Sequence, residues 1–155
     1  MPNSSDTETP AAEDRYNLNR FLSAQENTYE RSLLEIRSGQ KRTHWMWYIF
    51  PQFEGLSLSL RSQHYAIKSV EEARSYLSHP LLGPRLLESI EEVLRVEERT
   101  AQEIFGETDA QKLRSCATLF ALVSPTGSVF ERLLGKHYAS EQDIQTLELL
   151  HLDTP

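Results

Sequence analysis

The residues best suited to bind a small molecule lie at positions 41–52, in the string KRTHWMWYIFPQ. Both tryptophans of the chain, Trp45 and Trp47, stand here after two basic residues. Adjacent bulky aromatics before a proline favour extended backbone, so we expect this segment to cross the core with both indoles on one side. One interpretation is dense core packing, because aromatic side chains dominate cores. The other is a pocket wall, in which the indoles stack on a planar ring and Arg42 or Lys41 holds an anionic group.

A serine-rich stretch, GLSLSLRSQHY over residues 55–65, leads into a predicted helix. The hydroxyl groups of Ser59 and Ser62, together with backbone N–H groups, could hold an anion at the helix start. Alternatively, these serines form a turn that only caps the helix. His64 and Tyr65 are adjacent and face different sides. We interpret the histidine as structural and the tyrosine as a candidate for proton transfer.

A third polar cluster lies on one predicted helix, over residues 108–123. Asp109, Lys112 and Cys116 stand at positions i, i+3 and i+7 and share one face, with Ser115 beside it. The acidic and basic residues could form only a first-turn ion pair, or they could take part in a site. Cys116 has apolar neighbours, so we expect an inert core thiol.

The periodicity of apolar residues indicates that helices position these clusters. Apolar residues from Leu18 to Ile36 recur about every 3.5 positions, which predicts one long helix ended by Gly39. Gln25 interrupts the apolar stripe of this helix. Because buried amides are normally paired, Gln25 is either a hydrogen-bonded core residue or a site residue. A proline in a first turn, Pro84, starts another long helix.

Four further helix starts show a capping residue with Glu or Gln three places later. The last of these helices is expected to end at Gly135, since glycine commonly terminates a helix. A final helix is expected over about residues 141–150, with Ile144 and Leu150 packed inward. The four capping pairs are Ser69 with Glu72, Thr100 with Glu103, Thr108 with Gln111, and Ser128 with Glu131.

These elements predict a mainly α fold, a single compact multi-helix domain with one short extended aromatic segment. We expect seven or eight helices around one core, because no segment shows the two-residue alternation of a half-buried strand. Residues 1–14 are small, polar and acidic and are expected to be a disordered tail. The helical domain is expected to cover residues 15–151, with a frayed C-terminus at 152–155.

The composition argues against several classes of partner. The 155 residues carry a net charge of −7 with a pI near 5.2, so we expect neither duplex nucleic acid nor a membrane as partner. The single cysteine excludes an internal disulfide and a CxxC metal site. The N-terminal residues do not resemble a secretory signal, and the apolar runs are too short to span a bilayer. We expect a soluble cytoplasmic protein, and a nuclear location also fits.

Motifs for metals and cofactors are absent from the sequence. The five histidines are scattered and show no HxxxH or HExxH spacing. The sequence contains no Walker A loop, no GxGxxG and no GxSxG motif. We therefore predict no metal site and no cofactor.

Several short motifs spread over residues 16–150 occur together in this chain. The most specific is HWMWYIFPQ at residues 44–52. The other motifs are RFLSAQ at 20–25, YAI at 65–67, the segment from Ala73 to Pro80, LGPRL at 82–86, Phe105-Gly106, and Asp109 with residues 112–120.

With these motifs the chain resembles the family called domain of unknown function 1810, whose members are sometimes labelled calpastatin-like. That label implies a disordered protease inhibitor, which a folded, aromatic-rich domain contradicts. Two positions depart from the family pattern, since Leu58 stands where glycine is preferred and Cys116-Ala117 replace a Ser-Met-like pair. Either change could reshape a pocket.

The chain also resembles, more loosely, the NADAR group, which is associated with NAD and ADP-ribose metabolism and includes N-glycosidases. The resemblance rests on Gln63-His64-Tyr65, the segment 80–85, and Gly106 with Asp109 and Lys112. It implies a ribosyl-phosphate ligand and an N-glycosidase-like hydrolase. The glutamate that the glycosidases use is Gln63 here, and a glutamine cannot act as an acid or a base. The resemblance therefore favours binding over hydrolysis by that mechanism.

Three functions fit the sequence. The first is binding or processing of a nucleotide-like, ADP-ribose-related molecule in an aromatic and basic pocket, with proton transfer by Asp109 and Tyr65. The second is a non-enzymatic helical interaction module, which predicts no pocket shared by Trp45, Gln52 and Lys112. The third is a tailoring enzyme that acts on an aromatic metabolite. The expected ligand-binding residues are Gln25, Arg42, Trp45, Trp47, Gln52, Ser59, Ser62, Lys112 and Ser115.

Overall fold

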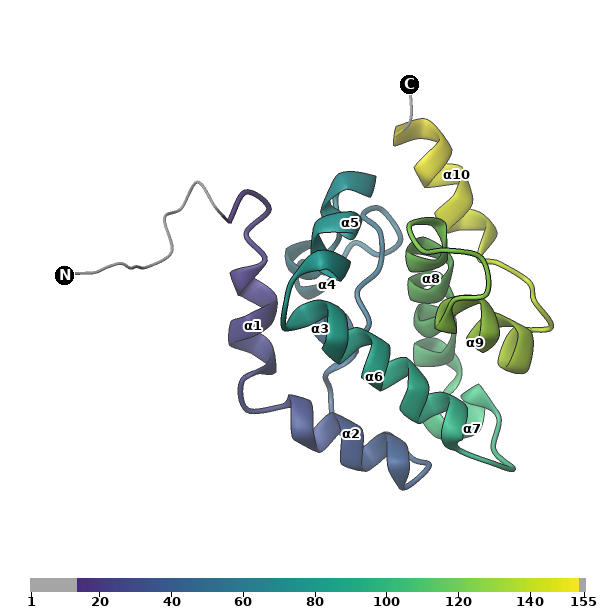
Figure 1. The fold of residues 1–155 in the computed structure, drawn as a ribbon. Helices are drawn as coiled ribbons and strands as arrows, with labels where there is room; N and C mark the ends of the chain where they lie inside the picture. The colour runs from purple at the N-terminus through teal and green to yellow at the C-terminus, as the bar shows by residue number, and fades with distance from the viewer. Residues whose placement is uncertain (1–13, 154–155) are drawn as a thin grey trace.

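The computed structural model describes residues 14–153 and forms a single compact, mainly α domain (Figure 1). The predicted fold class is confirmed, although this part of the chain forms ten helices, more than the seven or eight expected. The helices are α1 (Asn19–Gln25), α2 (Tyr29–Arg37), α3 (Met46–Ile49), α4 (Leu60–Tyr65), α5 (Val70–Ser78), α6 (Leu82–Arg95), α7 (Ala101–Phe105), α8 (Glu107–Leu122), α9 (Val129–Tyr138) and α10 (Ile144–Asp153).

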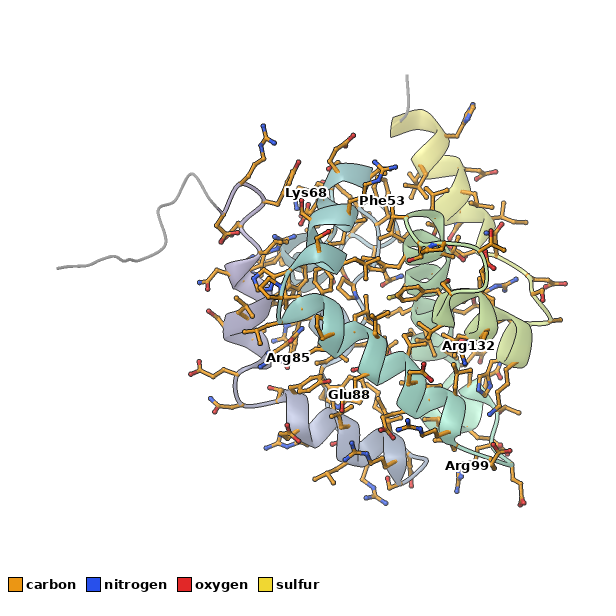
Figure 2. All side chains as sticks on the ribbon, in the orientation of Figure 1. Phe53, Lys68, Arg85, Glu88, Arg99 and Arg132 are labelled. Carbon is orange, nitrogen blue, oxygen red and sulfur yellow. The ribbon has the colours of Figure 1, made fainter. Side chains whose placement is uncertain are left out.

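Helices α6 and α8 organise the core. Helix α6 packs on α2 and α5 on one side and on α9 on the other, and it runs across the molecule in Figure 1. Helix α8 packs on α7, α9 and α10, and its residues 115–121 are all buried. Figure 2 shows that the side chains fill the space between these ribbons, with Arg85 and Glu88 of α6 on the side of α1 and α2. The exposed and half-buried polar residues of α8 lie in its first half, between Glu107 and Arg114.

The segment 18–36 is not one helix, as its periodicity predicted, but two. Helix α1 ends at Gln25, and α2 starts at Tyr29 after a three-residue turn. Neither glycine nor proline occurs in this turn, where the Thr28 hydroxyl donates to the Ala24 carbonyl at 3.1 Å. The predicted end at Gly39 is confirmed, because Gly39 adopts a positive φ of 80° and its N–H closes on the Ile36 carbonyl.

The aromatic segment is helical, so the expectation of extended backbone at residues 41–52 is wrong. Met46–Ile49 form the short helix α3, with the Ile49 N–H donating to the Trp45 carbonyl at 3.2 Å. Trp45 is therefore buried while Trp47 is half-buried, and the predicted common side of the two indoles is wrong. Extended pairing occurs just afterwards, as an isolated parallel bridge between Phe53 and Ile67. No strand forms in the part of the chain that the structure describes.

Three of the four capping predictions are confirmed. The hydroxyls of Ser69, Thr100 and Ser128 accept the backbone N–H three residues later, and each starts a helix. Thr108 does not cap α8, which begins one residue before it because Gly106, with φ of +84°, is the N-cap. Gly135 does not end α9 either, since the helix continues to Tyr138.

The ends of the described chain also differ in part from expectation. Helix α10 begins at Ile144, which is 68% exposed rather than packed inward, whereas Leu150 is buried as expected. The helix reaches Asp153, inside the stretch 152–155 that was expected to fray, and residues 154–155 lie outside the described chain. The predicted tail lies outside it too, except for residue 14. No helix within residues 14–153 is long and apolar enough to cross a membrane.

Candidate functional site

Gln25 is a core residue that joins three helices. Its side chain is 1% exposed, and its amide Nε2 donates to the Tyr48 carbonyl at 2.7 Å. Its Oε1 accepts from the Arg85 guanidinium at 3.2 Å. The structure therefore has the hydrogen-bonded core glutamine that was the first of our two interpretations. Gln25 lines none of the cavities described below.

Trp45 is sealed in the core by a buried carboxylate that the sequence did not reveal. The indole is 0% exposed, and its Nε1–H donates to Glu35 Oε1 at 2.8 Å. The same carboxylate accepts from the backbone N–H groups of Arg42 and Thr43, at 2.9 and 3.1 Å. Burial raises the pKa of the Glu35 carboxyl, but these hydrogen bonds outweigh burial and lower the pKa to about 2. Glu35 thus fixes the loop between α2 and α3.

The two basic residues before the tryptophans point to different places. Lys41 is almost buried, and its Nζ lies 2.8 Å from Asp109 Oδ2 and 5.0 Å from the centre of the Trp45 ring. Arg42 is exposed, and its guanidinium lies 3.5 Å from the Gln40 side-chain oxygen. Lys41 therefore links the aromatic segment to α8, whereas Arg42 lines none of the cavities described here.

Trp47 is the indole that lies next to a cavity. The Arg61 guanidinium carbon lies 4.8 Å from the ring centre, and Lys112 Nζ lies 5.2 Å from it. Trp47 lines a small cavity of about 20 Å³ together with Gln52 and Ser62. A cavity of this size has room for one water molecule. Gln52, Leu56 and Ser57 also line a larger cleft, so the cavity and the cleft adjoin.

The larger cleft has a volume of about 560 Å³ and lies between the loop after α3, the first half of α8 and the start of α10. We call it the amide cleft, because four glutamine side chains line it. Gln52 and Lys112 both line this cleft, while Trp45 lines none of the cavities described here, so the three do not share a pocket, as the interaction-module hypothesis predicts. The lining residues are Gln52, Leu56, Ser57, Thr108, Gln111, Lys112, Arg114, Ser115, Gln142, Asp143, Ile144 and Gln145.

Ser115 and Asp143 build the wall of the amide cleft at α10. The Ser115 hydroxyl oxygen lies 3.0 Å from Asp143 Oδ2 and 3.1 Å from the Gln111 carbonyl oxygen, so its single proton can be donated to either. The same carboxylate oxygen accepts the Thr146 N–H, so Asp143 caps the start of α10. The Asp143 N–H in turn donates to the Thr118 hydroxyl at 2.9 Å. Ser115 therefore anchors α10 to α8 as well as lining the cleft.

The serines before α4 form the helix cap that was the second of our interpretations. The Ser59 hydroxyl accepts the Ser62 N–H at 3.1 Å, and Ser59 is exposed and lines none of the cavities. Ser62 lines the small cavity. The expected anion cradle therefore reduces to one serine beside Trp47.

The two residues expected to transfer protons lie in different surroundings. Tyr65 lines the small cavity, its ring centre lies 5.3 Å from that of Tyr48, and burial raises the pKa of its phenol. Asp109 lies between two ammonium groups, 2.8 Å from Lys41 and 3.7 Å from Lys112, and it lines neither cavity. The predicted ion pair within the first turn of α8 is thus present. The structure does not bring Asp109 and Tyr65 into one cavity.

A second cleft of about 500 Å³ lies near α4 and the starts of α1 and α5. We call it the basic cleft, because Arg15, His64 and Lys68 line it. Gln63 lines both the basic cleft and the small cavity beside Trp47. The labelled Lys68 side chain lies near the α5 end of the molecule in Figure 2.

Cys116 and the other potential metal ligands do not form a reactive site. The thiol is 0% exposed and burial raises its pKa well above the ordinary value, which confirms an inert core cysteine. Among the residues that the structure describes, no group of three or more His, Cys, Asp and Glu side chains is placed to hold a metal ion.

Comparisons with known proteins agree with the fold. The model of the family "Protein of unknown function (DUF1810)" matches residues 15–150. Among solved structures, the chain is similar to the conserved hypothetical protein Rv1873 from Mycobacterium tuberculosis, with 45% sequence identity and a TM-score of 0.87. The match covers 89% of this chain and 99% of that protein. No curated protein matches this chain.

Proposed function

The chain belongs to the DUF1810 family of proteins of unknown function, and we propose that it binds a nucleotide-like small molecule in the amide cleft. The observation that carries this proposal is the lining of the cleft, where four carboxamides converge with one partly exposed ammonium group beside an accessible indole.

The size and polarity of the cleft suit a small ligand. Its volume of about 560 Å³ falls within the range of about 300–1,000 Å³ that is usual for small-molecule sites. Each carboxamide carries both donors and an acceptor, so a glutamine can pair with the edge of a base or with ribose hydroxyls. Gln52 and Gln111 come from different elements, the loop after α3 and helix α8, so contacts from two walls are available.

Lys112 supplies the cationic contact that a nucleotide needs, and Trp47 lies beside it. The Lys112 side chain is 22% exposed and lines the amide cleft, where its ammonium group can meet a phosphate. The Trp47 ring lies 5.2 Å from that ammonium group and borders the adjoining cavity. That cavity has room for only one water molecule, so Trp47 acts by holding Lys112 in place and not by stacking on a base.

The similarity to the NADAR group supports a ribosyl-phosphate ligand but not the hydrolysis of one. In that resemblance, Gln63 takes the place of the catalytic glutamate. Gln63 lines the small cavity next to the amide cleft. Its Nε2 donates to the Leu58 carbonyl at 2.9 Å, which is a structural contact within the loop. Because an amide neither gives nor takes a proton at neutral pH, we propose binding as the activity.

Thermal-shift measurements test the proposal. The protein is mixed with ADP-ribose, NAD, and the four common ribonucleosides with their mono- and diphosphates. We expect at least one of them to raise the melting temperature by a few degrees at saturation, since a ligand that binds only the folded state stabilises it. Absence of any shift across this panel would reject the proposal.

Two matched variants locate the binding. Lys112→Met removes the ammonium group at the amide cleft, and Lys68→Met removes one at the basic cleft. We expect the first substitution to weaken the ligand-dependent shift and the second to leave it unchanged. The reverse result would place the ligand in the basic cleft and would contradict the proposal.

A further inference from the structure

The charges around the amide cleft restrict the ligand further, because two of the three charged lining residues already make contacts within the protein. Arg114 donates to the Glu141 carbonyl at 2.9 Å and to the Glu141 carboxylate at 3.2 Å. Asp143 Oδ2 accepts from both Ser115 and the backbone of Thr146. Arg114 and Asp143 therefore already make contacts within the protein that hold the cleft walls in place.

The exception among the charged lining residues is Lys112. Asp109 shares its carboxylate between Lys41 at 2.8 Å and Lys112 at 3.7 Å. The trio carries one net positive charge, and the Lys41 side chain is 7% exposed and lies against Trp45 rather than in the cleft. The surplus charge therefore belongs to Lys112, at the cleft surface.

The helix starts that border the cleft disfavour a second anionic group, because both carry carboxylates. A helix N-terminus attracts phosphate through its free N–H groups and its dipole. At the start of α10, the Asp143 carboxylate accepts the Thr146 N–H, and its own negative charge would repel a phosphate. The first turn of α8 carries Glu107 and Asp109, whose carboxylates would repel a phosphate there. One ammonium group is thus the main attraction for an anion.

We infer that the ligand of the amide cleft has a neutral, hydrogen-bonding body and a single phosphate group, as a nucleoside monophosphate has, and that it lacks a pyrophosphate. This inference rests on the proposed function and deepens it. The four glutamines bind the neutral part, and Lys112 binds the phosphate. A pyrophosphate would place its second charged group beside Asp143 or among the uncharged amides, where it would lose hydration without gaining a cation.

Titration calorimetry compares each ribonucleoside with its 5′-monophosphate, its 5′-diphosphate and, for adenosine, ADP-ribose. We expect the best monophosphate to bind about tenfold more tightly than its nucleoside, which is the usual gain from one charge-assisted contact. We expect the corresponding diphosphate to bind no more tightly than the monophosphate.

The variant Lys112→Met separates the phosphate contact from the rest of the site. Within this variant, the monophosphate should lose its tenfold advantage over the nucleoside. Lys68→Met at the basic cleft is the matched control and should keep that advantage.

The possible failures are distinguishable. Tighter binding of a diphosphate or of ADP-ribose, or an advantage of the monophosphate that survives in Lys112→Met, would overturn the single-phosphate inference and leave the proposed function standing. Absence of binding by every compound would overturn both.

Discussion

Trp45 and Trp47 stand two residues apart in the same aromatic segment, yet one is sealed in the core and the other borders a cavity. The Trp45 indole is 0% exposed and donates to Glu35, whereas Trp47 is half-buried beside Arg61 and Lys112. A helix turns about 100° per residue, so two residues point about 200° apart. In a strand they would share a side. The short helix α3 therefore divides the segment into a structural half and an accessible half.

Each indole lies beside a lysine, and both lysines pair with the carboxylate of Asp109. Lys41 lies near Trp45 and Lys112 near Trp47, and Asp109 pairs with both ammonium groups. The carboxylate lies closer to the nearly buried Lys41 than to Lys112. The partly exposed Lys112 ammonium group therefore remains available at the cleft. The comparison therefore predicts large stability effects around Trp45 and large binding effects around Trp47.

The largest expected effect is the loss of the sealed indole. Trp45→Ala should lower the free energy of unfolding by about 3–5 kcal/mol, the usual cost of a buried aromatic, and Trp47→Ala by only about 1–2 kcal/mol. Urea unfolding of both variants measures the difference. Equal losses would show that the two indoles are buried alike and would contradict the division of the segment.

Glu35→Gln should cost about 3 kcal/mol at neutral pH, because an amide group would face donors that need a carboxylate. The pKa of Glu35 is lowered from 4.5 to about 2 in the folded protein. Its stabilisation is therefore fully present above pH 4.5 and is lost as the pH falls towards 2.

Urea unfolding of the original protein and the variant at pH 6 and at pH 3 tests this dependence. The gap between them should shrink at the lower pH. Glu30→Gln, an exposed change on the same helix α2, is the control and should have little effect at either pH. A gap that is constant with pH would mean that the Glu35 carboxylate does not carry the stabilisation.

A smaller effect is expected at the carboxylate that links the two halves. Asp109→Asn leaves the nearly buried Lys41 ammonium group without its partner and should cost about 2 kcal/mol. The matched change Glu141→Gln breaks an ion pair whose acidic side chain is 73% exposed, and should cost below about 0.5 kcal/mol. Thermal denaturation compares the two, and similar losses would argue against a buried role for Lys41.

The smallest effect concerns the exposed cation over the accessible indole. Arg61→Gln should cost about 0.5 kcal/mol, as expected for a cation–π contact open to water, and should alter the fluorescence of Trp47. The fluorescence change caused by Arg61→Gln is also measured in the Trp47→Phe background. If the fluorescence change persists in that background, it comes from Trp45, and the assignment of Arg61 to the accessible half is wrong.

Local signals in the sequence predicted the helix starts well. Ser69, Thr100 and Ser128 cap their helices because the capping bonds span only three residues. Helix α9 passes through Gly135 because contacts from other helices hold its last turn. Lys136 donates to the Leu94 carbonyl of α6, and the Tyr138 hydroxyl donates to the Ala110 carbonyl of α8.

The failures involve partners that are distant in the sequence. The helical turn of α3 and the burial of Trp45 depend on Glu35, ten residues earlier on another helix. Spacing alone could not decide which indole faces the core. The break after Gln25 has no glycine or proline to mark it, and it lies where the Gln25 amide joins α3 and α6.

The site could be predicted only in part for the same reason. Gln52, Lys112 and Ser115 were expected to bind a ligand, and the structure brings them to one cleft. The amides of Gln111, Gln142 and Gln145 were missed, because they belong to no motif. They meet because α10 and the residues before it pack on α8, through contacts such as Ser115–Asp143 and Arg114–Glu141, which no spacing rule encodes.

The central claim, that the accessible half of the aromatic segment adjoins a ligand site and the sealed half does not, can be tested by NMR. The chain has two tryptophans, so a ¹H–¹⁵N spectrum has two indole N–H signals, which Trp47→Phe assigns. During titration with the four common nucleoside monophosphates, the Trp47 signal should move in proportion to saturation with at least one of them, while the Trp45 signal stays in place. A Trp47 signal that never moves, or a Trp45 signal that moves as far, would contradict the account.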